Sequence, residues 1–405
     1  MNRPSLTSVA PILALFVLAP SHPARAQQTP IAPHPIATIP FVLFHNRVYL
    51  PVQVNGKTFE MILDTGAAIS GLSQQTASAL QLQKSGTATV TGNGESRPKI
   101  ELARNVGFRL GDVELLEKLV GIEQWDDLEL REGKAIAGFL GVNLFRRYVV
   151  ELDYPNRTLS IFEPENFVYA GPGARVTLIQ KHGAALFHAV IQLAGHDPIP
   201  SELAIDSGTY SALRLYRPFV EKHHLLQEKP PGIDSYGFGL GGEFSERLGR
   251  VASLKSGALE IKEPVTAFST SHGGATSGHG YDGTIGGEIL SHFRVILDYP
   301  DQRVILEPAS NFAEPWESDT SGAIFRATDS SLRTISVAHV LDNTPAAAGG
   351  LKGGDIISSV NEQKASSLGV DGLRRLFYSP GKYHLEIQRG QKTLEADITT
   401  TSPLY

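Results

Sequence analysis

The sequence contains no cysteine, and that absence removes several kinds of chemistry at once. Disulfide bonds, thiolate metal sites and a cysteine nucleophile are all excluded from the 405-residue chain. The motifs G-x-S-x-G and H-E-x-x-H are also missing, so a serine hydrolase or a zinc site built on either motif has no support. The catalytic groups of any enzyme built on this chain must therefore come from other residue types.

The charge balance argues against a further class of function. The formal net charge is −6 and the pI is about 6.1, which disfavours nucleic acid as the main partner. Apolar residues account for 41% of the chain and charged residues for 19%, as in globular proteins rather than disordered ones. A globular chain of this length holds two or three domains, each with a core of its own.

The N-terminus carries the features of an export signal. Arg3 precedes an apolar run from Ala10 to Ala19, and Ala24-Arg25-Ala26 forms a small-x-small cleavage site. We therefore expect a signal peptide at 1–26 and a periplasmic or secreted mature protein. The lack of cysteine favours a bacterial periplasm or exterior over a eukaryotic secretory route. The alternative is an uncleaved membrane-associated helix, although this apolar run is too short to span a bilayer, and no later segment is a candidate for a membrane span.

Three short motifs occur twice, in the same order and at nearly the same spacing. The copies lie at 62–67 and 204–209, at 138–145 and 283–290, and at 152–155 and 297–300. The first motif reads Ile-Leu-Asp-Thr-Gly-Ala and then Ala-Ile-Asp-Ser-Gly-Thr, so that Asp64 and Asp206 are 142 residues apart (206 − 64). Landmarks that keep one order and nearly one offset indicate a duplicated fold with one such aspartate in each half.

The residues around Asp64 and Asp206 suit a pair of carboxylates. Each aspartate ends an apolar run and is followed by a hydroxyl residue and a glycine, which permits a tight turn. The hydroxyls of Thr65 and Ser207 can then cross-brace the two turns. If the turns meet, the carboxylates cannot both ionise, and they share one proton over a range of pH. The ionised member accepts a proton from water and the protonated member donates to a carbonyl oxygen, without a metal or a covalent intermediate.

These motifs together resemble the double hallmark of aspartic peptidases of the pepsin and retropepsin type. In that family, each Asp-Thr/Ser-Gly turn has an apolar-apolar-Gly partner segment, here 139–141 and 284–286. The resemblance covers about 40–310 and implies a mostly β, bilobal acid-protease fold of two duplicated retropepsin-like β-barrel lobes. It further implies an endopeptidase that hydrolyses peptide or protein substrates with Asp64 and Asp206 as catalytic residues and with neither cofactor nor metal. The residues expected to support the pair are Thr65, Gly66, Gly141, Ser207, Gly208 and Gly286.

The C-terminal part of the chain has a signature of its own. A strand-like alternation at 335–340 is followed by 343–357, which resembles the Ser-Pro-Ala-Ala-x-Ala-Gly-Leu-x-x-Gly-Asp-x-Ile segment of bacterial PDZ domains. The resemblance covers about 320–402 and implies a small α+β domain that binds an extended peptide, often a peptide C-terminus, as an added strand. The loop 328–332 stands where the family has an apolar-Gly-apolar loop before its first binding strand. A PDZ-like domain that only packs on the catalytic part is the alternative.

These patterns divide the chain into six segments. They are a signal peptide at 1–26, a flexible lead-in at 27–38, a first lobe at 39–166, a second lobe at 167–310, a linker at 311–321 and a PDZ-like domain at 322–402.

Local patterns predict several elements within the lobes. Asn55-Gly56 between two apolar runs predicts a hairpin turn. Ser73 is placed to cap a short helix that ends at Leu80, and 213–226 is expected to form the counterpart helix of the second lobe. The hairpins at 86–98 and 235–244 are candidates for lids over the cleft, although the first contains no aromatic residue.

Three further patterns are open to a structural or a functional interpretation. The segment 237–242 matches G-x-G-x-x-G but lies in no βαβ unit, which favours a flexible β-hairpin over a dinucleotide site. His272 and His279 occupy a Gly/Ser-rich loop, for which we favour a mobile loop over a metal site. His223 and His224 are adjacent in a predicted helix and are expected on a solvated face.

Two functions other than general proteolysis stay open at the level of sequence. A non-catalytic peptide-binding protein would use the cleft and the PDZ groove without hydrolysis. An enzyme restricted to self-processing would cleave only its own N-terminal segment. The intact Asp-Thr-Gly and Asp-Ser-Gly motifs speak against the first of these, since a relic need not keep both acids.

Overall fold

The computed structural model describes residues 33–181, 183–227, 232–278 and 280–403. The predicted signal peptide and residues 27–32 of the predicted lead-in lie outside the described residues. The end of that lead-in is part of the fold rather than flexible chain, because Ala37 and Thr38 already pair with Ile161 and Ser160. In the described part of the chain, no helix is long and apolar enough to cross a membrane.

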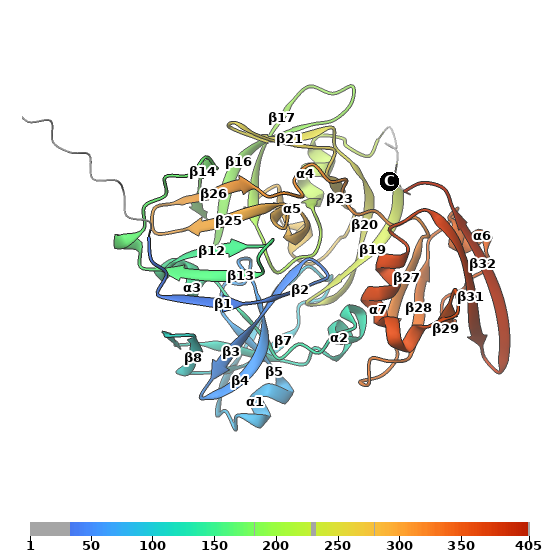
Figure 1. The fold of residues 1–405 in the computed structure, drawn as a ribbon, viewed down its shortest axis with the longest axis horizontal. Coiled ribbons are helices and arrows are strands. Elements are labelled where there is room, and N and C mark those ends of the chain that lie inside the picture. The colour runs from blue at the N-terminus through green and yellow to red at the C-terminus, as the bar shows by residue number, and fades with distance from the viewer. Residues whose placement is uncertain (1–32, 182, 228–231, 279, 404–405) are drawn as a thin grey trace, which may run out of the picture. The chain divides into compact units, whose positions relative to one another are not determined.

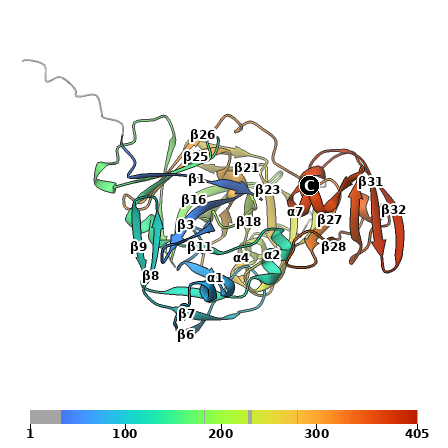
Figure 2. The ribbon, with the colours of Figure 1, turned by 60° about the horizontal axis from the view of Figure 1, so that its bottom comes forward.

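Lobe 1, as we use the term for residues 42–147, is built on a ten-stranded sheet. The path of the sheet is β6 (Lys84–Thr89), β7 (Lys99–Ala103), β10 (Val120–Glu123), β5 (Gly71–Ser73), β11 (Gly138–Leu140), β4 (Lys57–Leu63), β3 (Arg47–Val54), β8 (Val106–Leu110) and β9 (Val113–Glu117), with β2 (Val42–Phe44) paired to β3. Figure 2 shows the hairpins β6–β7 and β8–β9 that form its two ends. The predicted turn joins β3 to β4, where Asn55 and Gly56 have φ angles of 46° and 83°.

Lobe 2, residues 179–290, repeats this sheet strand for strand. Its path is β19 (Ile233–Gly239), β20 (Gly242–Arg250), β23 (Val265–Ser269), β18 (Leu213–Leu215), β24 (Gly283–Ile285), β17 (Ile199–Ile205), β16 (Ala184–Gln192), β21 (Ser253–Ser256) and β22 (Leu259–Lys262), with β15 (Ile179–Lys181) paired to β16. Each strand takes the place of its counterpart in lobe 1, from β6 matching β19 to β9 matching β22. The duplication predicted from three short motifs is therefore present in the topology.

A third sheet joins the two lobes through the hairpins of the repeated Leu-Asp-Tyr-Pro motif. Its order is β1 (Ala37–Pro40), β13 (Thr158–Phe162), β12 (Val149–Asp153), β25 (Phe293–Asp298), β26 (Arg303–Pro308) and β14 (Ala174–Thr177). The central pair is antiparallel and places Val150 opposite Leu297, one residue from each half of the duplication. Asp153 and Asp298 bond to their own turns, through Asn156 and Asp301 respectively, and so serve the hairpins. Figure 1 shows this sheet between the lobes.

Short helices complete the lobes. They are α1 (Gln74–Ala79), α2 (Asp126–Glu132), α3 (Asn143–Arg147), α4 (Arg217–Lys222) and α5 (Gly287–Leu290), with 3₁₀ turns at Pro164–Asn166 and Ala275–Ser277. Ser73 caps α1 as predicted, since its side chain accepts a hydrogen bond from the Thr76 N–H. The helix predicted at 213–226 was too long. Residues 213–215 form strand β18 because they pair with both β23 and β24, a long-range contact that overrides local preference.

The C-terminal domain forms a separate sheet with its own hydrophobic core. The sheet runs β27 (Ala323–Ala327), β28 (Ile335–Val340), β29 (Ile356–Val360), β31 (Gly381–Arg389) and β32 (Lys392–Thr400), with β30 (Gln363–Lys364) paired to β29 and with helices α6 (Pro345–Ala348) and α7 (Ala365–Leu376). Helix α7 packs against β27, β28 and β29, and its Val370 and Leu373 are fully buried. Strand β27 is therefore the edge strand that lies beside α7. The sequence had suggested the strand at 335–340 as the first binding strand, but that strand, β28, lies inside the sheet.

Candidate active site

Asp64 and Asp206 occupy equivalent turns at the ends of β4 and β17. Each of these strands has a parallel neighbour, and the neighbour supplies the apolar-apolar-Gly segment. The Asp64 N–H donates to the Leu140 carbonyl at 2.9 Å, and the Asp206 N–H donates to the Ile285 carbonyl at 3.0 Å. The two halves of the double hallmark, far apart in sequence, are thus adjacent strands in each lobe.

The glycines that follow these segments are required by close backbone contacts. A Cβ on Gly141 would lie 2.6 Å from the backbone carbon of Ile69, and a Cβ on Gly286 would lie 2.2 Å from the Ser211 carbonyl oxygen. Both contacts are closer than any side chain tolerates. Gly141 and Gly286 therefore support the turns by letting neighbouring backbone approach them.

The two turns are braced against each other by four hydrogen bonds. The Thr65 N–H donates to Ser207 Oγ at 3.1 Å, and the Ser207 N–H donates to Thr65 Oγ1 at 3.0 Å. The Thr65 hydroxyl in turn donates to the Ile205 carbonyl at 2.7 Å, and the Ser207 hydroxyl donates to the Leu63 carbonyl at 2.8 Å. Both hydroxyl residues are buried, at 1% exposure each. The cross-brace expected from the sequence is present, and it is symmetric.

The brace brings the two carboxyl groups together. Each aspartate accepts the N–H of the glycine in its own turn, at 2.9 Å for Asp64 and 3.0 Å for Asp206. Each carboxyl also lies against the opposite turn, because a Cβ on Gly208 would be 2.3 Å from Asp64 Cγ and one on Gly66 would be 2.8 Å from Asp206 Cγ. A hydrogen bond with the Asp64 side chain lowers the pKa of Asp206. Neither glycine is replaceable without displacing the partner carboxyl.

The surroundings raise the pKa of both aspartates. Burial, followed by the negative charge of Asp206, raises the pKa of Asp64 from 3.8 to about 7. Burial also raises the pKa of Asp206, but the Gly208 N–H and the guanidinium groups of Arg214 and Arg47 act against that rise. Two carboxyl groups this close do not both ionise freely, so they titrate as a pair that can share one proton.

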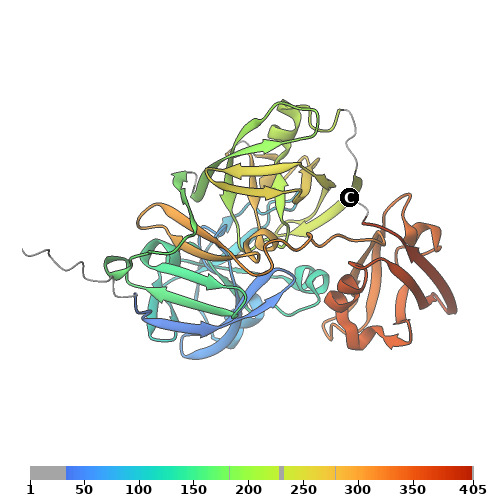
Figure 3. The same ribbon diagram turned by 45° about the horizontal axis from the view of Figure 1, so that its top comes forward.

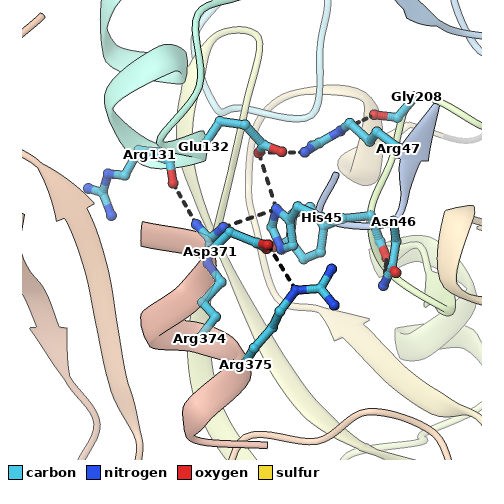
Figure 4. A network of polar contacts seen from close by, with 10 residues as sticks. His45, Asn46, Arg47, Arg131, Glu132, Gly208, Asp371, Arg374 and Arg375 are labelled. Carbon is cyan, nitrogen blue, oxygen red and sulfur yellow. Dashed lines mark hydrogen bonds and ion pairs between the residues drawn. The ribbon is translucent and has the colours of Figure 1, made fainter. Parts of the chain in front are cut away.

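Two buried arginines near the pair were missed by the sequence reasoning. The Nε of Arg47, at the start of β3, donates to the Gly208 carbonyl at 2.7 Å, and Nη1 contacts Glu132 Oε2 at 2.5 Å (Figure 4). Arg214 in β18 is 1% exposed and contacts Glu246 at 3.1 Å. Arg214 could have been suspected because it interrupts a Leu-Arg-Leu run, whereas Arg47 carries no such signal in the sequence.

The two hairpins predicted as lids meet each other. The Gly94 N–H donates to the Leu240 carbonyl at 2.9 Å, and the Ser96 N–H donates to the Gly241 carbonyl at 3.0 Å. Leu240, at the tip of the β19–β20 hairpin, also packs on a lobe 1 cluster that includes Trp125. We call these hydrogen bonds between 94–96 and 240–241 the lid contact. It joins lobe 1 to lobe 2 through backbone atoms, so it needs no aromatic residue in the first hairpin.

The remaining candidate patterns serve the structure. Residues 237–242 form the tip of the β19–β20 hairpin, as favoured by the sequence. His272 contacts Arg217 through its ring nitrogen, while His279 lies outside the described residues. His223 and His224 follow helix α4 instead of lying in it; His224 is exposed as expected, whereas His223 is half-buried and packs on Phe219 at a ring distance of 4.6 Å. Among the residues that the structure describes, no group of three His, Asp or Glu side chains is placed to hold a metal ion.

Comparison with known proteins identifies two domains. Residues 50–144 match the family model described as aspartyl protease, and residues 320–388 match that of the PDZ domain. The comparison with curated proteins gave no match. Among solved structures, the crystal structure of an aspartic proteinase from Irpex lacteus is similar at 12% identity, covering 69% of this chain and 98% of that chain with a TM-score of 0.44. The two family matches identify an aspartyl protease domain at 50–144 and a C-terminal PDZ domain at 320–388, and the sheets described above confirm the predicted mostly β fold with two duplicated lobes.

The cross-brace can be tested by removing one hydroxyl. Thr65→Val keeps the shape of the side chain but leaves the buried Ser207 N–H and Ile205 carbonyl without a partner. We expect the free energy of unfolding to fall by about 1–3 kcal/mol, the cost of a buried unsatisfied polar group. Thr65→Ser, which restores the arrangement of the other turn, should lose much less. Equal free energies of unfolding for the two variants in denaturant titrations would show that the hydrogen bonds of the brace do not stabilise the fold.

Proposed function

We propose that the chain is an exported aspartic endopeptidase in which Asp64 and Asp206 activate water. The observation that carries this proposal is the pair of carboxyl groups, each lying against the glycine of the opposite turn and held by a symmetric brace between two duplicated lobes. The match of the first lobe to the aspartyl protease family supports the general class. The dyad itself and its chemistry are our inference.

The proposed mechanism follows from one proton shared by the two aspartates, which we place on Asp64 because burial and the charge of Asp206 raise its pKa to about 7. In that state Asp206 is ionised and accepts a proton from a water molecule bound between the carboxyl groups. Asp64 is protonated and donates to the carbonyl oxygen of the scissile amide, which stabilises the developing charge. The hydroxide so formed adds to the carbonyl carbon. As the C–N bond breaks, the proton taken by Asp206 passes to the leaving nitrogen and a hydroxyl of the intermediate returns a proton to Asp64. Arg47 transfers no proton in this cycle. It donates a hydrogen bond to the Gly208 carbonyl and adds positive potential near both carboxyl groups.

We further propose that substrates are peptides or proteins and that the PDZ domain captures extended peptides, including peptide C-termini. The matches to a protease family and to the PDZ domain support partners of this kind. Export to the periplasm or the exterior rests on the N-terminal residues 1–26 alone. The N-terminal residue of the protein purified from its native cells would test export, with Gln27 as the expected start.

The first prediction is that the isosteric variants Asp64→Asn and Asp206→Asn lose peptide hydrolysis. Each change removes one member of the acid–base pair, and we expect kcat/KM to fall by at least about 100-fold, the lower end of what such catalysis contributes. Asp112→Asn, in an exposed turn of lobe 1, is the matched control and should keep full activity. The measurement is digestion of a mixed peptide library read by mass spectrometry. Undiminished cleavage by either active-site variant would reject the dyad, and no cleavage by the intact protein would favour a peptide-binding protein.

The second prediction concerns pH. The active form requires a proton on Asp64, so kcat/KM should decline as pH rises through about 7, where that proton is lost. On the acid side, activity should decline as Asp206 becomes protonated, at a pH above the ordinary aspartate value of 3.8 because its pKa is raised. A bell-shaped profile measured with one fluorogenic peptide is the expected result. Constant activity up to pH 9 would contradict this assignment.

A further inference from the structure

The PDZ domain has a groove between an edge strand and a helix. Strand β27 pairs with β28 on one side, and none of the other strands that the structure describes pairs with its second edge. Helix α7 packs along β27. An extended peptide adds to such an edge by main-chain hydrogen bonds, while pockets beside the edge receive its side chains. This is the groove in which a captured peptide would lie.

In this structure the groove is covered by a helix of the protease part. Helix α2 of lobe 1 contacts both β27 and α7 (Figures 1 and 3). Leu130 of α2 packs on the hydrophobic core of the PDZ domain, whereas Leu128 packs on a cluster of lobe 1. Residues two apart in a helix point about 200° apart. The short helix therefore has one apolar side chain for each domain.

The ends of α2 are also fastened to the groove. At its start, Asp127 contacts Arg326 of β27 at 3.3 Å. At its end, the Arg131 carbonyl accepts a hydrogen bond from Arg374 of α7 (Figure 4). The residue after the helix, Gly133, has a φ of 79°, and a Cβ there would lie 2.6 Å from Val370 Cβ of α7. Only glycine permits both this backbone conformation and this close approach.

The docked helix holds one of the two lids. Arg131 contacts Glu243 of the β19–β20 hairpin at 3.0 Å and lies over the Phe238 ring at 5.0 Å. His339 of the PDZ strand β28 contacts the same Glu243 oxygen at 2.7 Å and stacks on Tyr236 at 4.5 Å. Both contacts fasten the hairpin whose tip makes the lid contact with lobe 1. Docking of α2 in the groove and closure of the lid are therefore parts of one arrangement.

The same helix reaches the turn of Asp206. Glu132, its last residue, is 3% exposed and contacts both His45 and Arg47. Arg47 holds the Gly208 carbonyl, and Arg374 of the PDZ domain contacts His45 at 3.2 Å (Figure 4). A continuous set of polar contacts thus joins α7 of the PDZ domain to the candidate catalytic turn.

We propose that α2 is an internal ligand of the PDZ groove that keeps the protease latent, and that a peptide with an apolar side chain activates the enzyme by displacing Leu130. Displacement frees Arg131 from Glu243 and opens the lid contact. A helix of seven residues has little stability of its own, so its conformation depends on its contacts with lobe 1 through Leu128 and Glu132 and with the PDZ domain through Leu130. The part of this inference that concerns cleavage rests on the proposed function, whereas the competition between α2 and a peptide does not.

The test of competition uses the full chain with Asp64→Asn, so that no probe is consumed. The probe is a fluorescein-labelled octapeptide that ends in Val-Phe-Val-Leu, and a version ending in four serines is the control peptide. Adding Leu130→Asp should lower the Kd of the apolar probe at least about tenfold, because the groove is no longer occupied. Leu116→Asp, at an exposed leucine of lobe 1, is the matched control and should leave the Kd unchanged. Equal Kd values with Leu130→Asp and Leu116→Asp, or no binding to either, would overturn the proposal.

Hydrogen exchange gives a second readout that needs no change in the helix. In the Asp64→Asn protein, saturating probe should raise amide exchange in 126–132 and in 233–250, and the serine peptide should not. Unchanged exchange in α2 with bound probe would show that the peptide does not displace it. Because it uses the unchanged helix, this measurement also tests the displacement of α2 if the Leu130→Asp variant does not fold.

The activity arm separates this inference from the proposed function. With Asp64 restored, Leu130→Asp should raise kcat/KM without any probe, and the probe should activate the wild-type chain but not this variant. Lower activity of Leu130→Asp would overturn the latent role of α2. If no variant cleaves any peptide, the proposed function fails, while the binding and exchange results still decide whether α2 occupies the groove.

Discussion

The site depends on one symmetric interaction, the exchange of hydrogen bonds between Thr65 and Ser207 across the lobe boundary. Each hydroxyl accepts the N–H of the opposite turn and donates to a carbonyl of the opposite strand. Because both residues are buried, each lost bond would leave a polar group without water. The brace sets the two turns face to face, and the pairing of β12 with β25 holds the lobes at the same seam. The closeness of the carboxyl groups and their raised pKa values follow from that placement.

Duplication made much of this arrangement predictable. The repeated motifs predicted the two aspartates. The hydroxyl residue and the glycine that follow each aspartate predicted the brace, because the same three residue types occur in both copies. Local signals were equally direct at Asn55-Gly56 and at Ser73, where turn and cap chemistry act over a few residues. The PDZ domain was recognisable from one contiguous segment. In these places, the information that determines the structure lies within short stretches of chain.

Contacts between distant segments were not predictable in this way. The sequence of 213–215 predicted the start of a helix. These residues form a strand because they pair with β23 and β24, and that pairing cannot be seen in the local sequence. Arg47 contacts Glu132 and Arg374 contacts His45, and Glu132 and His45 contact each other, although the two arginines lie 327 residues apart in the chain (374 − 47). The local sequence of Leu130 does not distinguish it from other helix residues, and its contact with the PDZ core is seen only in the structure. No periodicity or motif marks such a residue.

The central claim is that Asp64 and Asp206 share a single proton. The most direct measurement is a ¹³C NMR titration of the aspartate carboxyl carbons, with Asp64→Asn and Asp206→Asn used for assignment. We predict that Asp64 titrates near pH 7 and that its pKa falls in the Asp206→Asn variant, because the neighbouring negative charge is gone. Titration of both aspartates close to the ordinary value of 3.8, with no effect of one on the other, would contradict the claim.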